Sequence, residues 1–131
     1  PIMLCSCKVC KSKDPKNYRT RASIYVEYQG KKLLVDTSTD LRYQTLKNKL
    51  KKIDAVLYTH PHSDHISGLD DLRAFNYFQK ERIPLYVHSW TARELPERYP
   101  YIFKPTVIEG AAVSQVELKE LNENADYWDV L

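Results

Sequence analysis

Apolar and polar residues follow two alternating patterns along the chain, one typical of strands and one typical of helices. Residues 23–28 (SIYVEY) and 31–36 (KKLLVD) are rich in β-branched and aromatic residues and flank a Gln29-Gly30 turn, which predicts a hairpin. The apolar run in the second segment is expected of a strand buried on both faces. Further strands are predicted at 53–58 (IDAVLY), 84–89 (PLYVHS) and 113–121 (VSQVELKEL).

In the segments between these strands, apolar residues recur at the spacing of an α-helix. Residues 41–51 predict an amphipathic helix, and residues 90–99 predict a short helix interrupted by Pro96. The apolar positions are Tyr43, Leu46 and Leu50 in the first helix, and Leu69, Leu72, Phe75 and Phe78 in another helix that follows 53–58. Strands that alternate with helices indicate an α/β architecture, and 131 residues suit a single domain.

Composition and charge exclude some classes of protein. The net charge is +3, from 20 basic and 17 acidic residues, which is too mild to indicate nucleic-acid binding by itself. Basic residues cluster in 8–21 and 47–52, where a solvated face is the simpler interpretation and a guide for a phosphate-bearing substrate is the alternative. No apolar stretch approaches the roughly 20 residues of a membrane span, and no signal peptide is visible. We therefore expect a cytoplasmic protein with no membrane partner.

All 3 cysteines lie in the first ten residues, as CSCKVC. Cys5, Cys7 and Cys10 form a poor disulfide framework, because a bridge within C-x-C is strained and one thiol is always left over. Reduced thiolates that hold a metal are the favoured interpretation, and incidental free cysteines are the alternative.

The segment 58–69, YTHPHSDHISGL, is the densest group of candidate metal ligands. His60 and His62 are two residues apart and can point to one side of an extended segment. Asp64 and His65 follow after the chain turns, so we expect them to face a second metal nearby, and Gly68 allows a close backbone approach. Asp64 is placed to ligate that metal and to orient or deprotonate a nucleophilic water.

The motif THPHSDHISGL resembles the HxHxDH signature of the metallo-β-lactamase superfamily, and LLVDTST resembles its first motif. The resemblance implies that Asp36 supports the metals from behind their ligands, with a simple turn or helix-cap aspartate as the alternative. CSCKVC resembles the PhnP-like phosphodiesterase branch, which implies that Cys5, Cys7 and Cys10 bind a structural Zn²⁺. The coenzyme-PQQ protein PqqB is similar in both motifs, and tRNase Z shares HxHxDH.

This resemblance implies half of an αββα sandwich, a mixed β-sheet with helices on one face. The superfamily draws further histidine and aspartate ligands from downstream, whereas the one histidine left here, His88, is expected to be structural or at the pocket rim. We therefore expect 1–131 to be the incomplete N-terminal portion of a single domain, inactive alone. Its exposed apolar surface should cause self-association, for instance as a swapped dimer.

The favoured function is a metal-dependent hydrolase with a dinuclear Zn²⁺ or Mn²⁺ site, in which Asp64 and His65 are catalytic and the substrate is a small anionic phosphodiester. Three alternatives stay open. They are a non-catalytic zinc-binding or assembly module, a PqqB-like cofactor-biosynthesis protein and an RNA-processing nuclease, although nucleic acid is not the favoured partner.

Overall fold

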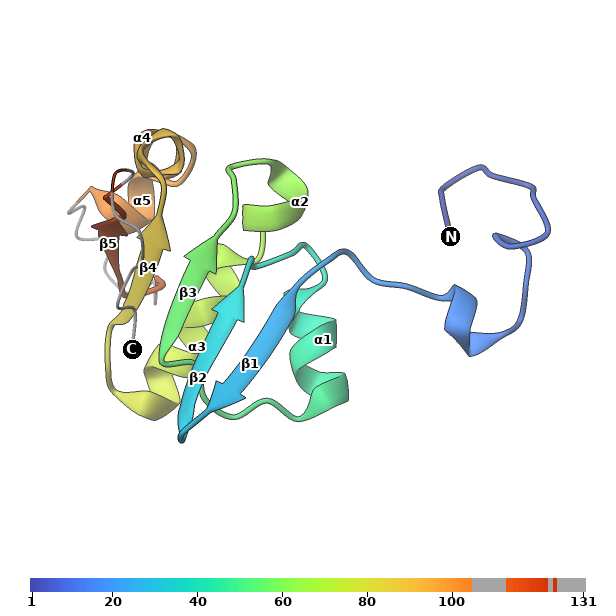
Figure 1. The fold of residues 1–131 in the computed structure, drawn as a ribbon, viewed down its shortest axis with the longest axis horizontal. Helices are drawn as coiled ribbons and strands as arrows, with labels where there is room; N and C mark the ends of the chain where they lie inside the picture. Colours follow the sequence, from blue (N-terminus) through green and yellow to red (C-terminus); the bar gives the residue numbers. More distant parts are fainter. Residues whose placement is uncertain (105–112, 123, 125–131) are drawn as a thin grey trace.

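A mixed five-stranded sheet forms the centre of the computed structural model, which describes residues 1–104, 113–122 and 124 (Figure 1). The strands are β1 (Ile24–Tyr28), β2 (Lys31–Val35), β3 (Ala55–Tyr58), β4 (Ile83–Val87) and β5 (Val116–Glu120). They lie side by side in the order β1-β2-β3-β4-β5. β1 pairs with β2 as an antiparallel hairpin, and the remaining pairs are parallel. All five predicted strands are confirmed, with ends that differ by up to three residues.

The helices are α1 (Leu41–Asn48), α2 (Ser63–Ile66), α3 (Leu72–Gln79), α4 (Ser89–Arg98) and α5 (Pro100–Phe103), with short 3-10 turns at Pro15–Asn17 and Leu69–Asp71. Figure 1 shows α1 and α3 behind the sheet. The buried core lies between sheet and helices and includes Leu34, Val56 and Leu85 from the strands and Leu72 and Leu95 from the helices. The predicted mixed sheet with helices on one face is confirmed. Across the described residues, none of the helices has the length and apolar character needed to cross a bilayer.

Strand β1 carries exposed apolar side chains along one side. Ile24, Val26 and Tyr28 are 60%, 42% and 68% exposed, whereas Tyr25, which points the other way, packs against the core. Successive side chains of a strand point to opposite faces. The face of β1 away from the helices is therefore an apolar surface that no described residue covers.

The helix predicted over residues 41–51 is present as α1, but the prediction is wrong about which of its faces is buried and about where it ends. Tyr43 and Leu46 are 56% and 62% exposed, while Leu41 is 1% exposed and fills the core. The inward positions are Leu41, Gln44 and Asn48, offset from the apolar positions, and two of them are polar. The helix ends at Asn48 because Lys49 adopts a left-handed φ of 56°.

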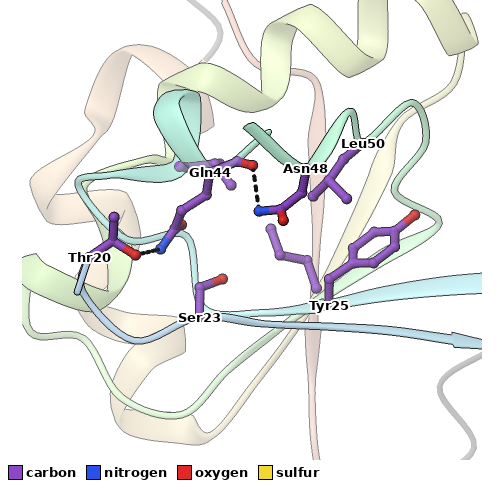
Figure 2. A pocket seen from close by; sticks show the side chains of 8 residues that line it. Thr20, Ser23, Tyr25, Gln44, Asn48 and Leu50 are labelled. Carbon is purple, nitrogen blue, oxygen red and sulfur yellow. Dashed lines mark hydrogen bonds between the residues drawn. The ribbon is translucent and has the colours of Figure 1, made fainter. Parts of the chain in front are cut away.

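Polar side chains on the inward side of α1 are accommodated by a cavity of about 390 Å³ between α1 and the β1–β2 hairpin (Figure 2). Gln44 Nε2 donates to Thr20 Oγ1 at 2.9 Å and to the Arg21 carbonyl at 2.8 Å. Asn48 Nδ2 donates to the Gln44 carbonyl at 2.8 Å. These bonds satisfy the inward polar groups, so Leu46 stays outside and helps Phe75 and Phe78 of α3 to line an apolar groove.

Two further helix predictions need correction. Phe78 belongs to α3 as expected but is 78% exposed, whereas Leu69, Leu72 and Phe75 are buried. Pro96 does not interrupt α4, which continues to Arg98. The proline ring fixes a helical φ and removes the N–H that would donate to the Ala92 carbonyl, so α4 continues with one hydrogen bond fewer.

Candidate metal centre

The carboxyl ends of three parallel strands bring the predicted ligands to one edge of the sheet. Asp36 follows β2, and the segment 59–66, called here the His–Asp loop, follows β3. His88 and Trp90 follow β4, which pairs with β3. Ligands of open α/β sheets bind outside the carboxyl ends of the strands, so this edge is the natural position for a site.

The Asp36 carboxylate holds the His–Asp loop in place. Its Oδ1 accepts a hydrogen bond from the Thr59 backbone N–H at 2.9 Å, and its Oδ2 accepts from Thr59 Oγ1 at 2.8 Å and from His65 Nδ1 at 2.7 Å. Asp36 is 4% exposed and has a φ of 61°, a left-handed conformation that costs free energy in a residue other than glycine. The structure therefore places Asp36 behind His65, and the turn or cap alternative is wrong.

His60 and His62 direct ring nitrogens at each other. Thr59 Oγ1 lies 2.9 Å from His60 Nδ1, which leaves His60 Nε2 at 3.1 Å from His62 Nδ1. Two imidazoles that share a tetrahedral zinc ion have nitrogens about 3.4 Å apart, from bonds of about 2.1 Å. The two histidines therefore fit one common divalent ion after a shift of a few tenths of an ångström.

Asp64 and His65 form a second pair of candidate ligands on α2. His65 Nε2 lies 3.5 Å from Asp64 Oδ2, and the Asp64 side chain is 58% exposed. The His60 and His65 rings are only 4.0 Å apart between centroids, so the two pairs are neighbours. Ile66, which is 1% exposed, fixes α2 to the core. The His60 ring lies closer to the His65 ring than to the His62 ring, at 4.6 Å, so the division of these residues into two ligand pairs stays a prediction.

Gly68 allows the loop to approach the β2–α1 connection. A Cβ atom at this position would lie 2.4 Å from the Ser38 carbonyl oxygen and 2.8 Å from Leu41 Cβ. The Gly68 N–H instead donates to the Thr37 carbonyl at 2.9 Å. The close backbone approach predicted from the sequence is confirmed. Below it, the buried Thr37 and Tyr58 hydroxyls lie 2.7 Å apart, and burial raises the pKa of Tyr58.

The cysteines lie on a separate N-terminal arm, residues 1–18, which Figure 1 shows extending away from the sheet. Their sulfur atoms all lie within 4.8 Å of one another. The Cys10 backbone N–H donates to Cys7 Sγ at 3.4 Å, and this bond contributes most to lowering the pKa of Cys7 to about 7. Thiolates are the form that binds metal. Within the described ranges, this is the one group of three potential ligands so close together, whereas the His–Asp loop supplies two pairs.

Sequence reasoning missed one residue at this edge, Trp90. Its ring lies 6.1 Å from the His62 ring at 85°, and it is 44% exposed. His88 serves as the N-cap of α4, with Nδ1 accepting from the Trp90 backbone N–H at 3.4 Å. The signal that could have pointed to Trp90 is its position two residues after His88, at the end of a predicted strand.

The sequence matches a known domain family and is similar to several known proteins. A model of the Beta-lactamase superfamily domain matches residues 31–127. The octanoyltransferase of Porphyromonas gingivalis is 36% identical over 111 residues, covering 84% of this chain and 22% of that protein. The ribonuclease Z of Clostridium kluyveri is 40% identical over 65 residues, covering 48% of this chain and 22% of that protein.

Solved structures show the same fold. A diphosphatase from the PhnP family superposes with a TM-score of 0.82 at 40% identity, covering 98% of this chain and 47% of that one. Zinc-bound PqqB from Methylobacterium extorquens gives a TM-score of 0.65 at 26% identity, covering 94% of this chain and 42% of that one. The chain thus spans less than half the length of each of these four proteins.

Proposed function

Because the chain belongs to the beta-lactamase superfamily, we propose that it is part of a metal-dependent hydrolase that cleaves small anionic phosphodiesters. The observation that carries the proposal is the His–Asp loop held by Asp36, in which two pairs of ligands lie side by side. The likeness to a PhnP-family diphosphatase supports a phosphate ester rather than a lactam or thioester as substrate.

His60 and His62 would hold one ion and Asp64 and His65 the other. A dinuclear Zn²⁺ or Mn²⁺ centre, when bound, supplies a hydroxide at neutral pH and stabilises charge on the phosphate. A carboxylate only accepts hydrogen bonds, so Asp36 holds the proton on His65 Nδ1 and leaves the Nε2 lone pair free to ligate. The exposed Asp64 carboxylate would orient the attacking water and accept its proton. The bond from phosphorus to the leaving oxygen would break, and the departing alkoxide would take up a proton from water.

Cys5, Cys7 and Cys10 would hold a structural Zn²⁺ through their sulfur atoms, which already lie within 4.8 Å of one another. A structural zinc almost always has four ligands, so this site needs one more. The lowered pKa of Cys7 favours the thiolate at one of the three positions, while the pKa of Cys10 is raised by its interactions with Cys5 and Cys7. In this proposal the zinc orders the arm and takes no part in hydrolysis.

Both proposed sites need ligands beyond those the described residues bring together. We propose that a longer form of the protein supplies them, and that residues 1–131 alone bind the catalytic metals weakly and are inactive. The apolar face of β1 supports a further layer of structure there, contributed by the same chain or by a second copy in a swapped dimer.

Hydrolysis of bis-p-nitrophenyl phosphate by the zinc- or manganese-loaded longer protein tests the proposal. We expect turnover, and we expect His62→Ala to abolish it with the circular dichroism spectrum unchanged. Tyr77→Ala is the control and should keep turnover, because Tyr77 is 68% exposed on α3 and lies in neither ligand pair. An inactive wild type with its full metal content would refute the phosphodiesterase assignment, and an active His62→Ala variant would remove His62 from the site.

A second candidate is an RNA-processing nuclease, supported by the likeness to ribonuclease Z over 65 residues. Cleavage of a precursor tRNA by the loaded protein, with no turnover of the small phosphodiester, would favour it. A non-catalytic zinc module and a PqqB-like role would be favoured by retained cysteine-bound zinc with neither activity.

A further inference from the structure

We propose that Trp90 forms an aromatic platform at the rim of the metal centre and binds the planar ring of the substrate, such as the nucleobase of a nucleotide. The inference rests on the proposed function for the position of the phosphate. It adds a substrate class to that function, a phosphate ester whose phosphate lies close to an aromatic ring.

The backbone of Trp90 is fixed while its side chain is accessible. Its N–H is capped by His88 Nδ1 at 3.4 Å, and the next residue, Thr91, is 1% exposed. The indole is 44% exposed. A rigid aromatic side chain on an anchored helix start loses little conformational entropy when it binds a ligand.

The indole of Trp90 lies next to one of the candidate ligands, His62. Trp90 and His62 meet in a T-shaped arrangement, with their centroids 6.1 Å apart. His62 Nδ1 in turn lies 3.1 Å from His60 Nε2, where the phosphate would meet the metals. In the proposal, a base that contacts the exposed part of the indole and a phosphate at the metals belong to one nucleotide, because Trp90 and the ligand pair are neighbours.

Exposure alone would not single out Trp90. Phe78 and Tyr77 are more exposed, at 78% and 68%, but they lie on the last turn of α3, which leads into β4 at its amino end. Trp90 follows the carboxyl end of β4, where the ligands gather. Stacking on an aromatic side chain strengthens the binding of a base by about 5- to 100-fold, which is enough to select one substrate class.

Binding of AMP and of ribose 5-phosphate to the zinc-loaded longer protein tests the platform without hydrolysis. The two ligands share the phosphate and the sugar, and only AMP has a base. Calorimetry should show AMP binding about tenfold more tightly, and Trp90→Leu should reduce this preference to less than about twofold. AMP should also quench the part of the tryptophan fluorescence that Trp90→Leu removes, and ribose 5-phosphate should not.

Phe78→Leu is the matched control and should keep the AMP preference of the wild type. The platform is overturned if the wild type binds both ligands equally, if it binds neither, or if Trp90→Leu keeps the preference. These outcomes are separable from those of the hydrolysis assay. An AMP preference without phosphodiester turnover would refute the proposed function alone, whereas turnover without the preference would refute the platform alone.

Discussion

The His–Asp loop and the N-terminal arm both present candidate ligands for metals, but they are supported in different ways. The loop follows a buried strand, and Asp36, Thr59 and Gly68 connect it to the core by hydrogen bonds. The cysteines of the arm are held by bonds from neighbouring residues of the arm itself, such as Ile2 N–H to Cys10 Sγ at 3.4 Å. Cys7 is exposed, and Figure 1 shows the arm apart from the sheet.

We infer from this difference which of the two candidate metal sites would depend on a bound ion for its structure. The protein core orders the loop during folding, so the entropy cost of aligning those ligands is met before any ion binds. Among the described residues the arm has no such support. In the proposed zinc site, binding of the ion would therefore order the arm, as in small zinc domains that fold around their metal. We therefore expect metal removal to leave the loop in place and to release the arm.

Gly68→Ala should have the largest effect on the sheet and helices. The added Cβ would lie 2.4 Å from the Ser38 carbonyl oxygen, so the loop or the β2–α1 connection must move. We expect the free energy of unfolding to fall by about 2–4 kcal/mol, measured by urea denaturation. Gly30→Asn is the control, because a Cβ there meets nothing within 4 Å and asparagine tolerates the φ of 78°. Equal stability of the two variants would contradict the close approach at Gly68.

The elements of the sheet and the role of Gly68 could be predicted from sequence, because each depends on local signals. Alternation, the Gln29-Gly30 turn and a glycine after a turn are visible without knowledge of the tertiary structure. The inward face of α1 could not be predicted in this way. Gln44 points inward, where Thr20 and Arg21, far away in the sequence, accept its hydrogen bonds, and Asn48 beside it donates to the Gln44 carbonyl.

Asp36→Asn should have an intermediate effect, on metal affinity rather than on the fold. The new amide N–H₂ would face His65 Nδ1 and favour the tautomer that carries its proton on Nε2, the nitrogen needed for the metal. We expect the affinity for zinc at the His–Asp loop to fall by about 10- to 100-fold, measured by competition with a chelator.

Asp54→Asn is the matched control for this change, since its carboxylate is also partly buried and accepts from the Lys32 N–H at 2.9 Å, far from the loop. It should leave zinc affinity unchanged. If both variants bound zinc as the wild type does, Asp36 would not position His65.

The candidate site was only partly predictable for a related reason. The spacing in HPHSDH indicates ligands in one loop, but the proximity of Asp36 to His65 follows from the parallel pairing of β2 and β3. Trp90 needs the next pairing as well, between β3 and β4. Local spacing was enough to predict the ligands of the His–Asp loop. Trp90 was missed because its position beside the loop depends on the order of the strands, which the sequence alone does not give.

Cys7→Ser should have the smallest effect on the stability of the sheet and helices. This variant therefore tests the arm independently of the His–Asp loop. The arm makes few contacts with the core, so the free energy of unfolding should change by less than about 0.5 kcal/mol. Loss of zinc should instead expose Lys8 and Lys11 to trypsin, and mass spectrometry should show cleavage there before any cleavage at Lys80 or Arg82. Cys7→Ser and chelator-treated wild type should give the same early fragments, because both lack the ion that orders the arm. Arm cleavage that is equally slow with and without zinc would mean that the arm is ordered by other contacts, and the contrast between the two regions would then be wrong.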